Sequence, residues 1–415
     1  MPARRRNAPP SDDTEIGKLV ADVHNKMGEG TMLLGSQMPS FTHIPFHCFI
    51  LDFATLGGYP EHCGHMLYGN ENCGKTTLTL KAIASGQQKY PNDWAVLVDV
   101  EKKFDPVWAR RHGVNLDKIR IVRPGTGEKA VDIIEASCRA KEVFMVALDS
   151  IPGLLPFNIL DKSAEDKTMA ERARLVGLLC SKLQQAWIDE QQRDHRFTFL
   201  CINQYREAIG KFSPHGGTPT SLPGGRFQNY MVDTKLEIRK QEIMEDRGGF
   251  QTHIRNEHSF KFTKSKCGFS IKSGDFVMVM DDAGREDGLK TGDYDDYKTL
   301  VTYAKKLGIV TGGGTKWTLL YPHGPTNKSH PVFSNLDAMM RGIRDNQEYD
   351  LATRQLCIMI KRRQTKLPAL PPDRFLLQPV TLEAGERLEA LADSLYASIS
   401  NEEAESEEET ETSDE

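Results

Sequence analysis

The chain has 415 residues, of which 39% are hydrophobic and 27% charged, enough for two or three domains with real hydrophobic cores. No run of 18 apolar residues occurs, so no membrane span is expected, and the basic N-terminus lacks the apolar segment of a secretory signal. The net charge of −5 is uneven: residues 402–415 hold nine acids and no bases, and without them the chain carries +4.

The eight cysteines predict the redox environment. They form no C-x-x-C pair and stand mostly in apolar contexts, which is typical of reduced, buried thiols in a cytosolic protein, so we expect a cytoplasmic location. The stretch HCGH at His62–His65 could be read as a set of metal ligands. Because no second pair of ligands follows, turn and strand residues are the expectation there.

Periodicity and composition divide the chain into six segments. They are a disordered basic N-terminus (1–13), an N-terminal helical segment (14–54), an α/β core (55–287), a small α-rich C-terminal domain (288–375), a terminal helix (376–401) and a disordered acidic tail (402–415). In the core, short β-rich runs alternate with helical patterns, which predicts a mostly parallel sheet flanked by helices. The tail is typical of a solubilising segment, or of a tethered polyanion that competes with nucleic acid for a basic surface.

The stretch HMLYGNENCGKTTLTLKAIA predicts a strand, a phosphate-binding loop and a helix. In the motif Gly69-x-x-x-x-Gly74-Lys75-Thr76, backbone N–H groups cradle phosphates, the lysine reaches the β- and γ-phosphates, and the threonine hydroxyl ligates Mg²⁺. The N-terminus of the helix adds its dipole. The sequence therefore predicts an ATP–Mg²⁺ site with contacts from Gly69, Asn70, Glu71, Asn72, Cys73, Gly74, Lys75, Thr76 and Thr77.

Acidic residues follow two further apolar runs. WAVLVDV leads to Glu101, whose position suits a general base that orients water against the γ-phosphate. VFMVALDS reaches Asp149, where a carboxylate beside a phosphate-binding loop holds Mg²⁺ through water. Asp105 and Trp108 could bracket a nucleobase, although plain packing also explains the tryptophan.

A long loop follows the apolar run FTFLCINQ. After Asn203 and Gln204 come roughly two dozen residues rich in Gly, Pro, Thr and Ser, among which are Arg206 and Lys211. Compact domains rarely carry structureless loops of more than about 12–15 residues unless the loop is functional or disordered. The loop is therefore a candidate binding element.

These stretches together resemble the RecA family, the ATP-dependent strand-exchange proteins of homologous recombination. The stretches that carry the resemblance are MGEGTMLLG, GNENCGKTTLTL, DVEKKFDPVWARRHGV, LDSIPGLLPF, INQYREAIG, TKSK and LKTGDYDDYKTLVTYAKKLGIV. They are nearly colinear with the family and cover roughly Asp13 to Leu320. The resemblance implies a RecA-type ATPase core, an N-terminal helix that docks on a neighbouring subunit, and a helical filament with ATP between subunits.

The resemblance also implies roles for individual residues. Glu101 would activate the attacking water, Asp105 and Trp108 would meet the adenine, and Gln204 would sense the γ-phosphate. Lys264 and Lys266 would reach the neighbouring subunit's ATP; without the resemblance they are two solvent-facing lysines on a strand. DNA would be contacted by two loops and their flanks: Met169 and Arg174 for the first, and Arg206, Ile209, Lys211, Gly224, Gly225 and Arg226 for the second. The implied partners are single-stranded DNA, homologous duplex DNA, single-strand-binding proteins and mediator proteins.

Several departures from the family pattern suggest a bacteriophage-encoded RecA-like protein. The interior of the phosphate loop reads Asn70-Glu71-Asn72-Cys73, Trp108 stands where tyrosine is more usual, and residues 321–375 have no clear counterpart. A hexameric replicative helicase is the nearest alternative, but it would need a large domain before Gly69. A regulatory ATP-binding scaffold that exchanges no strands is the other.

Overall fold

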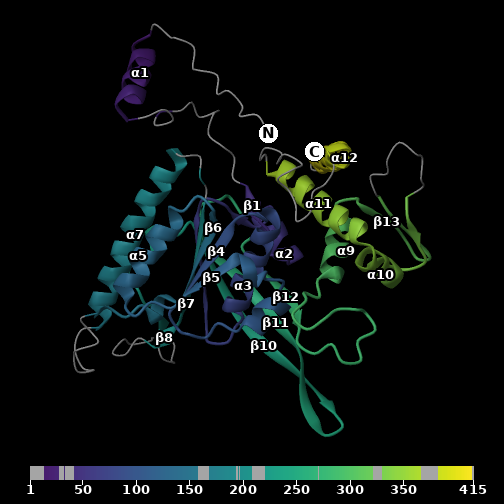
Figure 1. Ribbon diagram of the computed structural model, residues 1–415. Coiled ribbons are helices and arrows are strands. Elements are labelled where there is room, and N and C mark those ends of the chain that lie inside the picture. Colours follow the sequence, from purple (N-terminus) through teal and green to yellow (C-terminus); the bar gives the residue numbers. More distant parts are fainter. Residues whose placement is uncertain are drawn as a thin grey trace.

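The computed structural model describes residues 14–27, 32, 42–157, 168–192, 195, 197–207, 220–269, 271–320, 330–365 and 382–413. Within these ranges the centre is an eight-stranded sheet with the strand order β12-β11-β10-β3-β7-β6-β4-β5 (Figure 1). Its strands are β3 (Gly64–Gly69), β4 (Trp94–Asp99), β5 (Ile119–Val122), β6 (Val143–Asp149), β7 (Thr198–Gln204), β10 (Thr234–Arg247), β11 (Phe250–Ser265) and β12 (Ser273–Val279). The strands from β10 to β5 are parallel, whereas β11 and β12 add antiparallel pairs at one edge. The predicted α/β class is confirmed.

Helices cover both faces of this sheet because its strands are apolar on both sides. Along β6, Met145 and Ala147 face a core shared with α3, and Val146 and Leu148 face a second core shared with α5 and α7. Figure 1 shows α5 and α7 together on one side of the sheet. The helices and short elements of this region are α2 (Phe49–Thr55), α3 (Lys75–Lys89), α4 (Pro106–Arg111), η2 (Leu116–Lys118), α5 (Gly127–Cys138), η3 (Ile151–Gly153), α7 (Thr168–Gln192) and α8 (Gln228–Met231), with β1 (His43–Ile44), β2 (Tyr59–Pro60), β8 (Arg206–Glu207) and β9 (Thr220–Ser221). The N-terminal helix α1 (Glu15–Met27) stands clear of the sheet.

The hairpin of β10 and β11 is longer than the sequence suggests. The apolar runs stop near Lys240, yet the two strands stay paired as far as Arg247 and Phe250 and project beyond the sheet (Figure 1). Most side chains of this outer part are exposed, so no alternation of apolar residues marks it. Cross-strand hydrogen bonds satisfy its backbone, and Gly248 and Gly249, both at positive φ, form the turn.

The C-terminal unit contains strands as well as the expected helices. It is built from α9 (Tyr297–Lys306), α10 (Leu336–Asp345), α11 (Gln347–Gln364), α12 (Leu382–Ser413) and an antiparallel sheet of β13 (Val310–Gly313), β14 (Lys316–Leu319) and β15 (Val332–Phe333). Strands of two to four residues are too short for their periodicity to stand out, which explains why only the α-rich character of this unit was predicted. Helix α12 continues through the acidic segment to Ser413 and does not end near residue 401, because glutamate is a good helix former.

A buried ion pair joins the C-terminal unit to α2. Arg354 on α11 donates to both carboxylate oxygens of Asp296, at 2.7 and 2.9 Å, and the backbone N–H of Phe49 donates to the same carboxylate at 2.6 Å. Asp296 is only 3% exposed. Phe49 and Phe53 of α2 pack in the apolar core of the C-terminal unit, so the two regions share this junction.

We expect Asp296→Ala to lower the free energy of unfolding by about 3–5 kcal/mol, because the change leaves the Arg354 guanidinium buried without its main partner. Urea unfolding followed by circular dichroism measures the loss. Asp345→Ala is the matched control, because Asp345 pairs with Arg344 while 66% of its side chain is exposed. The control should lose less than about 1 kcal/mol. Equal losses in both variants would contradict a structural role for the buried pair.

Candidate active site

The phosphate-binding motif lies where the sequence predicts it, between the end of β3 and the start of α3. Gly69 closes the strand, Gly74 precedes the helix at φ 88°, and Asn72 has φ 56°. A Cβ atom on Gly69 would lie 2.1 Å from the carbonyl oxygen of Ile238, and one on Gly74 would lie 3.0 Å from His258 Cε1. Both positions therefore need glycine for the path of the loop.

The loop encloses the ammonium group of Lys75. Its Nζ donates to the carbonyl oxygens of Gly69, at 3.4 Å, and Asn70, and contacts Cys73 Sγ at 3.4 Å. Lys75 and Cys73 are buried, whereas Asn70, Glu71 and Asn72 are exposed. The two carbonyl oxygens fix the position of this buried ammonium group, which can supply positive charge to an anionic ligand.

Thr76, in the first turn of α3, is hydrogen-bonded to Asp149, at the end of β6. The Thr76 hydroxyl donates to Asp149 Oδ2 at 2.8 Å, and Thr76 is exposed. The pKa of Asp149 is raised to about 6. Burial is the largest cause, and the negative charges of Glu101 and Asp99 also raise the pKa, whereas the hydrogen bond from Thr76 lowers it. Above that pH the carboxylate is ionised.

These residues fit a magnesium nucleotide. A threonine hydroxyl beside a carboxylate offers the oxygen ligands that Mg²⁺ prefers, and Lys75 supplies a charge for phosphates. The backbone at Gly69 and Gly74 leaves no room for a Cβ atom, as a loop wrapped around phosphate requires.

Glu101 is held beside the end of β6. Its carboxylate accepts hydrogen bonds from Ser150 Oγ and from Gln204 Nε2 at 3.4 Å, and Lys103 Nζ lies at 3.0 Å. Burial alone would raise the pKa of Glu101, but the hydrogen bonds from Ser150 and Lys103 and nearby positive charges outweigh it and lower the pKa. The group is thus an ionised carboxylate at neutral pH, as a general base requires.

Asp99 and Ser150 are site residues that the sequence reasoning missed. Asp99 is 3% exposed and accepts from the backbone N–H groups of Lys103 and Phe104 at 3.0 and 3.1 Å, and it pairs with Arg123 at 3.2 Å. It thereby shapes the turn that carries Glu101. An acid at the end of the strand WAVLVD was the signal that could have pointed to Asp99, whereas nothing in the sequence marks Ser150.

Asp105 and Trp108 lie next to the first turn of α3. Asp105 caps α4 by accepting from the N–H groups of Val107 and Trp108 at 2.8 and 3.3 Å. The Trp108 indole N–H donates to Thr77 Oγ1 at 3.2 Å. The cap occupies one Asp105 oxygen and orients α4, so that Trp108 lies against the helix of the phosphate loop.

Lys264 and Lys266 lie at the other end of the sheet. Ser265 on β11 pairs with Thr234 on β10, and Thr234 pairs in turn with His65, near the start of β3. The phosphate loop begins at the other end of β3, at Gly69. Four residues of strand separate the two levels, roughly 13 Å. Lys264 Nζ donates to the carbonyl oxygens of Asn229 and Val232, and Lys266 Nζ lies 3.2 Å from Asp233. The structure does not bring these lysines to this chain's own phosphate loop.

The arms of the long loop are described, whereas its tip, with Ile209 and Lys211, lies outside the described residues. Arg206 is exposed in β8, which pairs with β9. Asn203 and Gln228, which the sequence reasoning did not single out, hold the returning arm: Asn203 Nδ2 donates to Gln228 Oε1 at 2.8 Å and to the Pro223 carbonyl at 3.0 Å. Gln204 is the last residue of β7, from which this loop departs, and its side chain contacts Glu101.

The other residues predicted to contact DNA gather near this arm. A Cβ atom on Gly224 would lie 3.1 Å from Ile151, and one on Gly225 would lie 3.0 Å from Ala173, next to the exposed Arg174 on α7. Both glycines have positive φ, so close packing on η3 and α7 explains them. Arg226 is exposed, and the side chain of Met169 lies outside the described residues.

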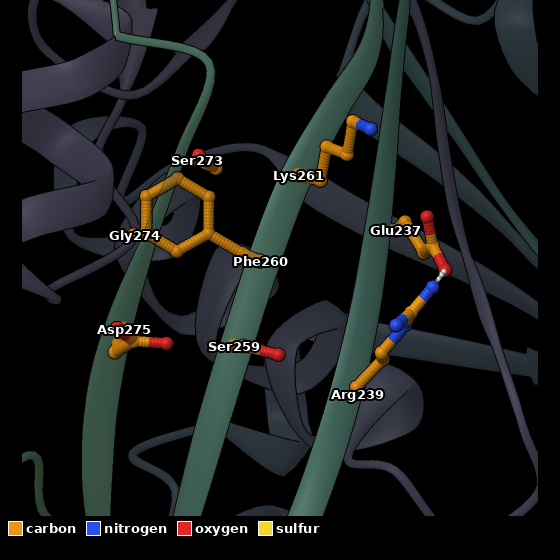
Figure 2. A pocket seen from close by; sticks show the side chains of 8 residues that line it. All are labelled: Glu237, Arg239, Ser259, Phe260, Lys261, Ser273, Gly274 and Asp275. Atoms are coloured by element: carbon orange, nitrogen blue, oxygen red, sulfur yellow. Dashed lines mark hydrogen bonds and ion pairs between the residues drawn. The ribbon is translucent and has the colours of Figure 1, made fainter.

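A pocket of about 310 Å³ lies on strands β10, β11 and β12, where Glu237 pairs with Tyr68 at the end of β3 (Figure 2). Its lining consists of Glu237, Arg239, Ser259, Phe260, Lys261, Ser273, Gly274 and Asp275. Figure 2 shows Arg239 pointing at Glu237, and their ion pair measures 2.9 Å. No residue that the sequence predicts for the site lines this pocket.

In the HCGH stretch, His65 is held by structural hydrogen bonds. His65 uses both ring nitrogens, one with Thr234 Oγ1 and one with the Pro60 carbonyl, each at 2.7 Å. Across the described ranges no group of three or more potential metal-binding side chains occurs. No helix among them has both the length and the apolar character needed to cross a membrane.

Comparison with known proteins identifies relatives of the chain. Residues 14–284 match the family described as RecA N-terminal domain. The chain is 33% identical to Protein RecA of Oceanobacillus iheyensis over 55% of its own length and 64% of that protein. It is 31% identical to Protein RecA of Bacillus licheniformis, over 71% of this chain and 80% of the relative. With Protein RecA of Bacillus pumilus it shares 34% identity over 58% and 68% of the two chains.

Proposed function

Because this chain belongs to the RecA family, we propose that it is an ATP-dependent DNA recombinase. In this proposal it polymerises on single-stranded DNA and catalyses homologous pairing and strand exchange in recombination, repair and recombination-dependent replication. The observation that carries the proposal is the contact of Gln204 with Glu101, at the point where the long loop leaves the sheet. Through this contact one side chain connects a nucleotide site to a candidate DNA-binding loop.

The nucleotide would be bound by the phosphate loop. Lys75 would hold the β- and γ-phosphates, and Thr76, with Asp149 through water, would hold Mg²⁺, which neutralises charge on the phosphates. Glu101 would accept the proton of the attacking water, since hydrogen bonds from Ser150 and Gln204 orient its carboxylate. Trp108, fixed by Thr77, would lie against the adenine.

DNA would be bound along the loop arms. Arg206 on β8, Arg174 on α7 and Arg226 are exposed and positively charged, which suits phosphate contacts that do not depend on base sequence. Two positive charges lie close together where the loop begins, at Arg172 and Arg206. Burial, and then the charge of Arg206, lower the pKa of Arg172. Ile209, at the loop tip, would wedge between base steps.

The filament would place each nucleotide between two subunits. Lys264 and Lys266 lie far from their own chain's phosphate loop, which supports a role on the neighbouring subunit's ATP. Ile16 and Leu19 on α1 are about half exposed and would dock on that neighbour. Single-strand-binding and mediator proteins would assist the assembly on DNA.

A joint-molecule assay tests this function. The protein, ATP and Mg²⁺ are mixed with circular single-stranded DNA and a homologous linear duplex, and the products are separated on a gel. We expect joint molecules with homologous and not with heterologous duplex. Unwinding of a forked duplex without pairing would indicate a helicase, and ATP binding with neither activity would indicate a scaffold.

We expect Gln204→Ala to bind ATP normally but to lose the stimulation of hydrolysis by single-stranded DNA, by about 10²-fold. Without the amide, DNA bound to the loop no longer repositions Glu101. Phosphate release with and without DNA, together with binding of a fluorescent ATP analogue, measures both properties. Gln185→Ala, an exposed glutamine on α7, is the control. Normal stimulation in Gln204→Ala would remove this residue from the coupling.

A further inference from the structure

A buried imidazole lies directly against the phosphate loop. His258 on β11 is 3% exposed, and its Cε1 atom is 3.0 Å from the position that a Cβ atom on Gly74 would take. The ring stacks on Phe276 of β12, with the centroids 4.6 Å apart and an angle of 6° between the planes. Strand pairing fixes this position, since His258 pairs with Lys240 on one side and with Phe276 on the other. The sequence reasoning did not single out His258.

The two ring nitrogens of His258 have no hydrogen-bond partner in the part of the chain that the structure describes. A buried polar group without a partner is costly, so it calls for an explanation in a bound molecule or in function. An apolar ring could stack on Phe276 in the same way without this cost. Packing alone therefore does not explain an imidazole at this position.

The His258 imidazole is neutral at neutral pH. Its pKa is lowered to about 4: burial is the largest cause, the charge of Lys240 also lowers the pKa, and the backbone of Cys73 raises it. The Lys240 ammonium group is itself paired with Glu242 at 2.6 Å. A neutral imidazole carries one N–H donor and one acceptor nitrogen. His258 can therefore donate one hydrogen bond to a carbonyl group of the loop.

The peptide unit that joins Cys73 to Gly74 lies beside this ring. His258 shares its face of β11 with the core residue Phe260, so the ring meets the loop from the core side, whereas phosphates would approach from the solvent side. The carbonyl and the N–H of a trans peptide point in opposite directions. A Cys73 carbonyl held toward His258 therefore directs the Gly74 N–H toward the phosphates.

We infer that His258 is a positioning residue of the phosphate loop, whose ring N–H donates to the Cys73 carbonyl when a nucleotide is bound. The phosphate accepts from the Gly74 N–H at one end of the peptide unit, and His258 holds the carbonyl at the other end. Each hydrogen bond favours the orientation that the other needs, so His258 contributes to nucleotide affinity. The inference rests on the nucleotide site of the proposed function and adds a residue to it.

The test compares His258→Phe with His258→Gln. Phenylalanine keeps a flat ring for stacking on Phe276 but has no polar atom, whereas glutamine keeps a hydrogen-bond donor. We expect His258→Phe to bind a fluorescent ATP analogue about tenfold more weakly, which corresponds to the loss of one hydrogen bond. Its melting temperature without nucleotide should be equal or higher, because a buried unpaired polar group is removed.

His258→Gln should bind the analogue within about threefold of the unmodified protein, because the donor is retained. In DNA-dependent hydrolysis, His258→Phe should raise KM and leave kcat unchanged, since the hydrogen bond holds the loop equally before and during the reaction. His253→Phe is the matched control: it makes the same change on the same strand, in the outer part of the hairpin, where His253 Nε2 lies 2.7 Å from Asn256 Oδ1. The control should bind the analogue normally.

The outcomes separate this role from the recombinase function. A folded His258→Phe protein that binds the analogue as tightly as the unmodified protein overturns the role, and so does a His258→Gln protein that is as weak as His258→Phe. If the unmodified protein binds no nucleotide, the nucleotide site and the role of His258 are overturned together. If the affinities change as expected in a protein that forms no joint molecules, the role of His258 stands and the proposed recombinase function fails.

Discussion

Replacing Lys75 with alanine is expected to lower kcat for ATP hydrolysis by on the order of 10²–10³-fold and to weaken ATP binding. The ammonium group is the positive charge enclosed by the carbonyls of Gly69 and Asn70, where the phosphates would lie. The alanine removes this charge without changing the glycines that shape the loop. Phosphate release in the presence of single-stranded DNA and titration with a fluorescent ATP analogue measure the two effects.

Lys118→Ala is the matched control for this experiment. Lys118 precedes β5 at the opposite end of the sheet and donates to the Asn92 carbonyl at 2.9 Å. It should retain the hydrolysis rate of the unmodified protein. A Lys75→Ala protein that folds normally and hydrolyses ATP within a factor of about three of the unmodified protein would contradict the assignment of the phosphate site.

Glu101→Gln is expected to lower kcat by about 10²–10⁴-fold while ATP binding is retained. The amide keeps the size of the side chain but cannot take a proton from water. Because the pKa of Glu101 is lowered, the carboxylate of the unmodified protein is already ionised at neutral pH, so the loss should appear across the whole neutral range. Single-turnover hydrolysis and ATP-analogue binding separate chemistry from affinity.

Glu142→Gln controls for the removal of a negative charge, because Glu142 is exposed before β6, at the end of the sheet away from Glu101. It should hydrolyse ATP normally. A Glu101→Gln protein with an unchanged single-turnover rate would assign the base to another group. Asp149 is the alternative at this edge of the sheet, since its strand partner Asp99 is occupied by backbone N–H groups.

Local sequence predicted the strand, loop and helix of the candidate nucleotide site because these parts are contiguous in the chain. Gly69, Gly74, Lys75 and Thr76 lie within eight residues, and a glycine that needs positive φ or close approach is visible in a motif before any fold is known. Asp149 and Glu101 were also within reach of sequence reasoning, because parallel strands bring their carboxyl ends to one edge of a sheet. The domain boundaries and the phage-type origin stay predictions.

The sequence could not predict contacts between segments that are distant along the chain. Ser150 acts on Glu101, Asn203 on Gln228 and Arg354 on Asp296 through pairings that no periodicity encodes. The outer part of the β10–β11 hairpin and the small C-terminal sheet are exposed or short, so neither leaves an alternating pattern. Their strands are specified by cross-strand hydrogen bonds and by packing.

The sequence alone was sufficient for the α/β class and for placing the loop of Gly69 and Gly74 between a strand and a helix, because each depends on residues close together in the chain or on a strand's own period. The position of Lys264 and Lys266 at the far end of the sheet and the link from Gln204 to Glu101 required the three-dimensional arrangement. In each case the strand order brings distant residues together or keeps them apart, and strand order depends on the packing of the whole chain.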